Sequence, residues 1–184
     1  MPLKAHCKTV LYVDVLQRPK LRKIMKHKES DLQIRCIKWF RYQYPAYARL
    51  MEHPKNEGNG NRRQGSISKA EGVQAGVADL ILHVPVENYR FDGFRMGSFT
   101  SLAVEMKTPK GSQSKEQKEW QRFFEAAGGM YIVIRSYDDF VSEVTKYIDG
   151  VSQSTDAAIK KVYSEIQREA DEAAKEQFRK LINK

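Results

Sequence analysis

Three charged residues lie in two segments that are otherwise largely apolar. Asp79 lies near the start of residues 77–84, and Glu105 and Lys107 lie two positions apart within residues 99–107. Because side chains alternate between the two faces of a strand, Glu105 and Lys107 are expected on the same face of theirs. Charges in an apolar strand are costly to bury unless they are paired or bound to a metal. The pattern therefore indicates a polar centre built on two neighbouring strands.

Two carboxylates and an ammonium group that converge in this way suit a hard divalent cation. Mg²⁺ prefers oxygen ligands and keeps several waters, which leaves room for a phosphate oxygen and an attacking water. Such an ion polarises the phosphoryl group and lowers the pKa of bound water, and Lys107 is placed to orient that water or to neutralise charge developing on the phosphate. The pattern alone is weak, because a salt bridge between Glu105 and Lys107 on an exposed strand would look the same.

The surrounding elements predict an α/β fold. Apolar spacing of three and four residues predicts helices, and β-branched apolar runs predict strands. The expected helices are 29–44, 114–127, 137–148 and 155–182, and the expected strands are 77–84, 99–107 and 130–135. Ser114 and Gln117 have the spacing of a capping box at the start of the second helix. This order predicts a small mixed sheet packed between helices.

Three segments have less definite expectations. Residues 9–16 are rich in β-branched residues and could form a short strand, without an assigned role. Residues 54–65 are polar and rich in glycine, which indicates a loop that is mobile or ordered by a ligand. Residues 88–97 contain Asn88, Asp92, Gly93 and Gly97 and are expected to be a connector.

The net charge of +9 is unevenly distributed. Residues 1–70 carry 16 Lys and Arg against 5 Asp and Glu, whereas residues 71–150 carry 9 against 12. A basic surface beside an acidic centre suits an enzyme that cuts phosphodiesters, because cations hold the backbone and carboxylates hold the metal. The alternative is a basic face that serves solubility. No stretch reaches the roughly 18 apolar residues of a membrane helix, and the N-terminus lacks a secretory signal, so a cytoplasmic protein is expected.

The two cysteines, Cys7 and Cys36, have no spacing that suggests zinc or a disulfide framework. Both are expected to be free thiols. Cys36 falls in the amphipathic pattern of the first helix and is expected in the core. His53 and His83 are isolated and are expected to be structural or exposed. Trp120 lies on the apolar side of its helix and is expected in the core.

Beyond these patterns, four segments in one order resemble the VRR-NUC nuclease family. They are Lys69–Leu80, Ala103–Gly111, Ser114–Trp120 and Ala126–Gly129. The resemblance spans about residues 27–149 and implies a PD-(D/E)XK, restriction-endonuclease-like core that hydrolyses phosphodiesters with a metal. It divides the chain into a basic segment at 1–26, a nuclease domain at 27–149 and a C-terminal helix at 150–184.

The resemblance assigns roles to the central residues. Asp79 and Glu105 correspond to metal ligands for Mg²⁺ or Mn²⁺, the main-chain carbonyl of Met106 adds another, and Lys107 matches the motif lysine. Ala78 is a departure, since the superfamily often has proline there. The change alters backbone stiffness and removes no ligand.

Two further residues have a family role and an ordinary alternative. Gln117 matches a glutamine in the active-site helix of the family, and its alternative is a helix cap. Glu29 resembles an acidic residue that reaches the metal from the first helix. Its alternative is a first-turn glutamate favoured by the helix dipole.

Four basic residues are candidates for contacts with phosphates. They are Arg62 and Arg63 in the polar loop, with Lys69 and Lys110. The alternative for each is a solvated surface charge.

The resemblance also implies a substrate and an assembly. It implies structure-selective cutting of branched DNA, such as four-way junctions, by a homodimer whose two sites make two matched cuts. The last helix has an apolar stripe that could pack on a partner or back on its own domain. Three other readings stay open: a restriction-type or flap nuclease on the same core, a non-catalytic nucleic-acid-binding module, and a basic scaffolding protein.

Overall fold

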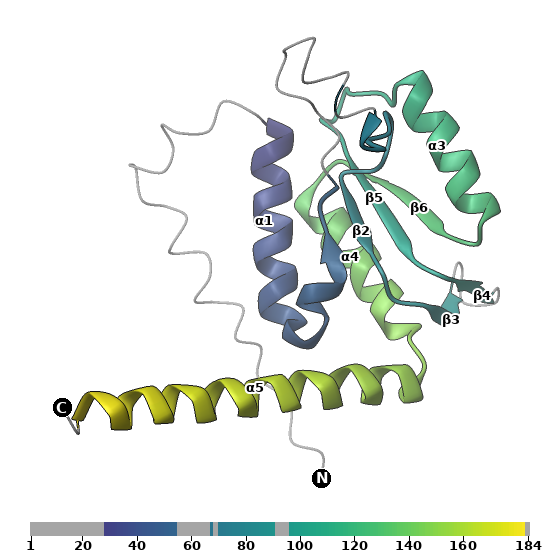
Figure 1. Ribbon diagram of the computed structural model, residues 1–184. Helices are drawn as coiled ribbons and strands as arrows, with labels where there is room; N and C mark the ends of the chain where they lie inside the picture. Colours follow the sequence, from purple (N-terminus) through teal and green to yellow (C-terminus); the bar gives the residue numbers. More distant parts are fainter. Residues whose placement is uncertain (1–27, 55–66, 68–69, 91–95, 183–184) are drawn as a thin grey trace.

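The structure, a computed structural model, describes residues 28–54, 67, 70–90 and 96–182. Its elements in chain order are α1 (Lys28–Gln43), the 3-10 helix η3 (Pro45–Leu50), β1 (Met51–Glu52), β2 (Leu80–Leu82), β3 (Val86–Arg90), β4 (Met96–Phe99), β5 (Leu102–Met106), α3 (Lys115–Ala126), β6 (Met130–Ile134), α4 (Tyr137–Asp149) and α5 (Gln153–Ile182) (Figure 1). The predicted α/β fold with flanking helices and a C-terminal helix is confirmed. The predicted strand 9–16 and nearly all of the predicted loop 54–65 lie outside the described residues.

The main sheet has four strands in the order β1-β2-β5-β6. The first three strands run antiparallel to their neighbours, and β6 runs parallel to β5, so the sheet is mixed as predicted. Leu80 of β2 lies opposite Val104 of β5. One further step in this register places Asp79 across from Glu105. The pairing of the two strands therefore brings together carboxylates that are 26 positions apart in sequence.

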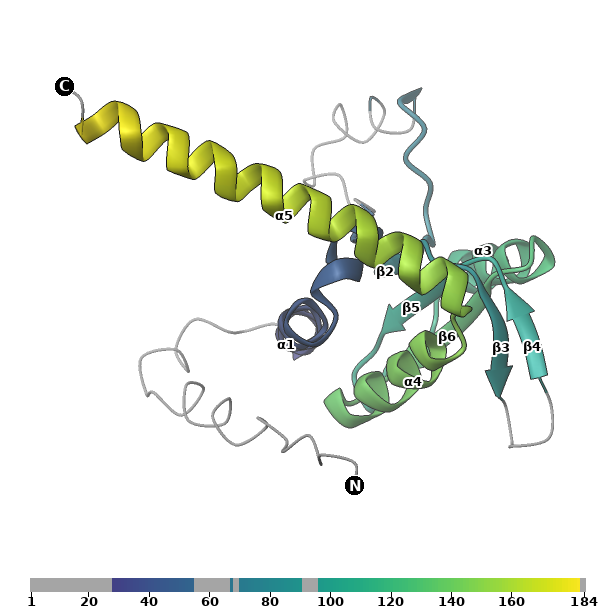
Figure 2. The same cartoon turned by 90° about the horizontal axis from the view of Figure 1, so that it is seen from below.

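Helices cover both faces of this sheet (Figures 1 and 2). A large buried cluster joins one face to α1 and α4, and it includes Leu102, Val104 and Met106 of β5. A smaller cluster on the other face joins Ala103 to residues of β6 and α3. Because β5 alternates strictly between these clusters, Glu105 faces the side covered by α3.

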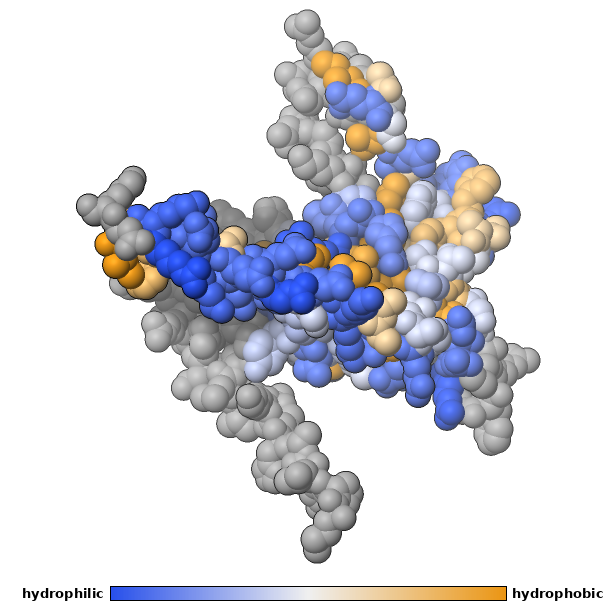
Figure 3. Space-filling model, turned by 60° about the horizontal axis from the view of Figure 1, so that its bottom comes forward, coloured by the Kyte–Doolittle hydropathy of each residue, from blue (hydrophilic) through white to orange (hydrophobic). Residues whose placement is uncertain are grey.

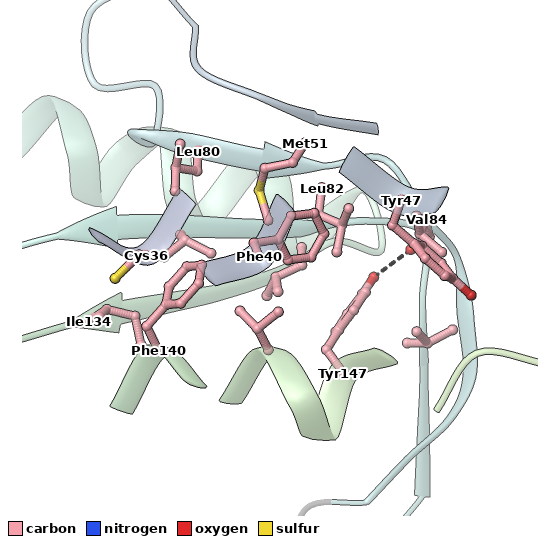
Figure 4. Packing of buried hydrophobic residues seen from close by; sticks show 14 of the residues in the cluster. Cys36, Phe40, Tyr47, Met51, Leu80, Leu82, Val84, Ile134, Phe140 and Tyr147 are labelled. Atoms are coloured by element: carbon pink, nitrogen blue, oxygen red, sulfur yellow. Dashed lines mark hydrogen bonds between the residues drawn. The ribbon is translucent and has the colours of Figure 1, made fainter. Parts of the chain in front are cut away.

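The large cluster packs α1 and α4 against one face of the sheet. Figure 4 shows aromatic side chains from α1 and α4 packed against the strands. The buried hydroxyl of Tyr147 donates to the main-chain carbonyl of Val84 at 2.8 Å, so the ring is held at a fixed depth (Figure 4). Cys36 is buried there as a free thiol, as expected, and burial raises its pKa to about 12. It is therefore a packing residue.

Two sequence predictions need correction. The predicted strand 99–107 is broken at Thr100 and Ser101 into β4 and β5, and both faces of β5 are buried. The predicted connector 88–97 is largely a hairpin of β3 and β4. Tyr89 anchors this hairpin through its ring contact with Tyr147 of α4, 6.3 Å between centroids. The hairpin therefore depends on a contact between residues distant in sequence, which a local sequence pattern does not predict.

The last helix, α5, leaves the domain. Near its start, Asp156 accepts a hydrogen bond from Tyr47 at 2.7 Å, and Ile159 packs against the large cluster. Farther along, α5 extends away from the domain (Figures 1 and 2). Its surface is mostly hydrophilic, with apolar residues near its C-terminal end (Figure 3). Within the described residues, no helix combines the length and the apolar character that a membrane span needs.

Candidate active site

Glu105 is the centre of the polar cluster between β5 and α3. Its side chain is fully buried, with 0% exposure. One carboxylate oxygen, Oε1, accepts from Lys107 Nζ at 2.5 Å and from the side-chain amide of Gln117. The other oxygen, Oε2, accepts from the hydroxyl of Tyr131 at 3.2 Å. A carboxylate offers about four acceptor positions, so these three donors fix its orientation and leave a position for one more ligand.

Lys107 is also nearly buried, with 9% exposure. Lys107 and Glu105 form the ion pair that the sequence allowed on an exposed strand. The strand β5 is instead buried on both faces. Burial raises the pKa of Glu105 above its ordinary range, and the charge of Asp79 raises it further, although Lys107 opposes both effects. A buried ion pair contributes little net stability compared with an apolar pair of similar volume. Its presence at this place is typical of a functional site.

Asp79 lies immediately before β2, across from Glu105. Its Oδ2 accepts from the main-chain N–H of Met106 at 2.7 Å. Burial raises the pKa of Asp79, and the Met106 N–H and the charge of Lys107 oppose that shift. The N–H and C=O of one strand residue point toward the same neighbour. The carbonyl of Met106 therefore faces the edge where Asp79 lies.

Gln117 is both a helix cap and a partner of Glu105. Its Oε1 accepts from the Ser114 N–H at 2.8 Å, and its own N–H donates to Ser114 Oγ at 3.2 Å, which completes the predicted capping box. Its amide nitrogen then points at Glu105. Gln117 therefore caps the helix and contacts Glu105 at the same time, because the hydrogen bond to Ser114 orients its side-chain amide toward Glu105.

Gly76 brings the segment that carries Asp79 against the first turn of α3. Its φ is +83°, a conformation that side chains with a Cβ rarely adopt. A Cβ at this position would lie 2.4 Å from the main-chain carbon and oxygen of Glu116 and 2.7 Å from the nitrogen of Gln117. Only glycine therefore permits this close approach.

Glu29 lies at the edge of the site, where its carboxylate accepts a hydrogen bond from the main chain. It is in the first turn of α1, and its Oε1 accepts from the Thr108 N–H at 2.9 Å, just beyond β5. Its charge contributes to raising the pKa of Asp79. In the part of the chain that the structure describes, no three His, Cys, Asp or Glu side chains gather closely enough to hold a metal by themselves. The centre is thus a pair of carboxylates with Glu29 beside it.

Sequence reasoning missed three residues that build this region. Tyr131 binds Glu105, and His53, which was expected to be isolated, has Nδ1 2.5 Å from the main-chain oxygen of Asp79. Arg135 donates to the carbonyls of Thr108 and Gly111 at 2.8 and 2.7 Å. Tyr131 lies one position from the start of an apolar strand, and its hydroxyl, the one polar side-chain group in that strand, was a usable signal for it. His53 follows a two-residue strand, which gives no such signal.

The remaining sequence candidates lie outside the central cluster. Lys110 is exposed in the turn that Arg135 holds, and His83 pairs with Glu52 at 2.9 Å on the surface. Trp120 is partly buried and stacks on Phe124 at 4.8 Å between centroids, above the smaller cluster. Three candidates for phosphate contacts and one cysteine lie outside the described residues: Arg62, Arg63, Lys69 and Cys7.

Comparison with known proteins identifies the family. A sequence model of the VRR-NUC domain matches residues 18–138. The chain belongs to the VRR-NUC family. A solved structure named as a VRR_NUC domain protein has a similar fold, with a TM-score of 0.54 and 19% sequence identity, over 70% of this chain and 94% of the other. No curated protein matches the chain in sequence.

Membership in the VRR-NUC family makes the chain a nuclease of the PD-(D/E)XK type, which acts on DNA. Nucleases of this type generally use divalent metals. The chemistry of the donor set fits such an ion, because Asp79 and Glu105 supply carboxylate oxygens, the ligands that a hard divalent cation prefers.

Proposed function

We propose that this chain is a metal-dependent DNA endonuclease whose catalytic centre is formed by Asp79, Glu105 and Lys107. The observation that carries the proposal is the fully buried Glu105 carboxylate, which three donors hold across from Asp79. Burying a carboxylate without compensation is strongly unfavourable. The strand nevertheless keeps this carboxylate, and hydrogen bonds orient it and pair it with a lysine. Such an arrangement supports catalysis that involves charged groups.

The oxygen atoms available at the centre are suited to Mg²⁺ or Mn²⁺. Asp79 and Glu105 would hold the ion, with the main-chain carbonyl of Met106 and, from the edge of the site, Glu29. A set with few protein ligands fits Mg²⁺, which keeps several waters. When bound, such an ion neutralises charge on the phosphate and lowers the pKa of an attacking water.

The protein's own groups then orient the reaction. Lys107 places a positive charge 2.5 Å from Glu105 Oε1, where it stabilises the negative charge that develops on the phosphate. Gln117 and Tyr131 hold the Glu105 carboxylate in one rotamer, so no reorganisation is needed as the charge develops. We therefore propose Gln117 as part of the catalytic centre.

We further propose that the nuclease domain, residues 27–149, acts on branched DNA such as four-way junctions, as a homodimer. The family resemblance supports this substrate, and a twofold dimer offers two matched sites for a symmetric junction. DNA phosphates would be neutralised by Lys and Arg side chains within residues 1–70, among them Arg62, Arg63 and Lys69, and by Lys110. The exposed Val162 and Ile166 on the apolar stripe of α5 are available to a second copy.

The test is cleavage of a labelled four-way junction, a matched duplex and a flap with Mg²⁺, with Mn²⁺ and with chelator. Glu105→Gln keeps the shape of the side chain and removes its charge, and Glu125→Gln makes the same change at an exposed position of α3. We expect cleavage only with metal and at least about a hundredfold lower rate for Glu105→Gln. Glu125→Gln is expected to cut at the original rate.

The outcomes separate the parts of the proposal. Equal cutting of all three DNAs would keep the chemistry and remove the preference for branches. A monomer at micromolar concentration would contradict the dimer. If the protein binds DNA and cuts none of it with either metal, the non-catalytic binding module is the correct reading.

A further inference from the structure

The face of α3 that points away from the sheet carries an unexplained combination of charge and an exposed aromatic ring. Gln117, Trp120 and Phe124 occupy the inner side of the helix, against Glu105 and the sheet. On the outer side, Phe123 is 72% exposed, although its neighbour Phe124 is packed. Neither the core nor the catalytic centre accounts for this outer ring.

A shallow, open depression lies against this outer side. Among the described residues, its lining is Lys115, Lys118, Glu119, Arg122, Phe123 and Ala126. Three of these side chains are cationic and one is acidic, so the lining itself carries a net positive charge, with the exposed Glu116 and Glu125 elsewhere on the helix. Within the described residues, no ion pair neutralises Lys118 or Arg122, whereas Lys146 and Lys160 on other helices each pair with a carboxylate.

We propose that this outer face of α3 binds a DNA strand with unpaired bases beside the reacting phosphate. The proposal rests on the nuclease function above and names the form of DNA that the site takes. Lys115, Lys118 and Arg122 rise along the helix by about 4.5 and 6 Å in turn, at 1.5 Å per residue. Cations in such a row bind successive phosphates of one backbone.

Phe123 supplies an aromatic surface on which an unpaired base can stack. A base presents its flat face to a side chain only where it is unpaired and unstacked, and aromatic rings beside a basic groove bind single strands in this way. An exposed ring has no comparable partner on an intact duplex. The combination therefore fits the unpaired bases at a branch point, gap or strand end.

The position of α3 connects this face to the chemistry. A helix with its side chains is about 10–12 Å across, and the first turn of α3 holds both Lys115 on the outside and Gln117 against Glu105. A strand that leaves the catalytic centre over this turn passes directly onto Lys118, Arg122 and Phe123. The outer face thus holds the DNA beyond the bond that is cut.

The experiment measures DNA binding by fluorescence anisotropy with the full chain in chelator, so that no cutting occurs. The probes are a single strand, a gapped duplex and a blunt duplex. The variants are Lys118→Ala combined with Arg122→Ala, and Phe123→Ala. Matched controls lie on α5, away from the catalytic centre: Lys175→Ala combined with Arg179→Ala, and Phe178→Ala, whose ring is 64% exposed.

We expect the double variant to weaken binding of the single strand and to lower the slope of log affinity against log salt by about 1.4, since each lost contact removes about 0.7. Phe123→Ala is expected to weaken binding of the single strand and the gapped duplex roughly tenfold and to leave the blunt duplex unchanged. The α5 controls are expected to change neither affinity nor slope.

Two results would overturn the inference. One is a double variant on α3 whose affinity and salt slope equal those of its α5 control. The other is a Phe123→Ala protein that binds all three probes like Phe178→Ala, as it would if the face binds another protein. Either result, with the unsubstituted chain still cutting DNA in Mg²⁺, removes the α3 surface alone. An unsubstituted chain that cuts no DNA with any metal removes the nuclease proposal.

Discussion

Substituting Gly76 by alanine tests whether the close approach of the Asp79 segment to α3 organises the site. Gly76 has φ +83°, and an added Cβ would lie 2.4 Å from main-chain atoms of Glu116. Gly72 offers a matched control, because its φ is +94° and an added Cβ would meet nothing within 4 Å. Gly72→Ala therefore reports the backbone penalty alone, and Gly76→Ala adds the collision.

The magnitudes follow from these geometries. An alanine in the left-handed region costs about 1 to 2 kcal/mol in either variant. Ordinary carbon contacts lie at about 3.5–4.0 Å, so at Gly76 two backbones must separate by about 1 Å, and forcing atoms into a packed region costs about 1 to 3 kcal/mol more. For a chain of this size, the melting temperature falls by about 4 °C in Gly72→Ala and about 10 °C in Gly76→Ala.

Gly76→Ala should also slow cleavage. The separation moves the first turn of α3, and with it the Gln117 amide that holds Glu105. A displacement of about 1 Å at reacting groups lowers the rate by about a hundredfold. The assay compares single-turnover cleavage and thermal unfolding of both variants. Equal melting temperatures and equal rates for Gly76→Ala and Gly72→Ala would refute the reasoning.

Three further predictions concern other contacts. Tyr131→Phe removes one donor to Glu105, so cleavage should fall several-fold while the free energy of unfolding changes by about 1 kcal/mol; an unchanged rate would contradict the positioning role. Lys107→Met leaves the buried Glu105 without its cation and should lower the free energy of unfolding in urea by about 3 kcal/mol, part of which Glu105→Gln restores in the double variant. Hydrogen bonds from Lys160 and Tyr47 lower the pKa of Asp156 in the folded state, so their stabilisation is present above the ordinary aspartate pKa and is lost as the pH falls through the lowered value. Unfolding followed at acidic pH should show this loss, and Asp156→Asn should remove it.

The sequence predicted the relative placement of Glu105 and Lys107 better than it predicted the elements around them. Period-two alternation placed Glu105 and Lys107 on one face, and the structure pairs them there. The capping box at Ser114 was also readable, because it depends on residues three positions apart. By contrast, the hairpin β3–β4 contains few β-branched residues, and its stability depends on Tyr89 packing against α4, a contact between residues 58 positions apart.

What the sequence by itself determined is the family, the longer helices and the charged residues that lie among apolar strand residues, because these follow from residue type and from spacing within one element. Only the tertiary structure decided that β5 is buried on both faces, that Tyr131 and His53 reach the centre, and that Gly76 presses against α3. These features arise from the pairing of strands and the packing of helices across long stretches of chain. The same packing turned Gln117 from a helix cap into a group that holds the buried carboxylate, since one amide can satisfy both partners only when α3 lies over β5.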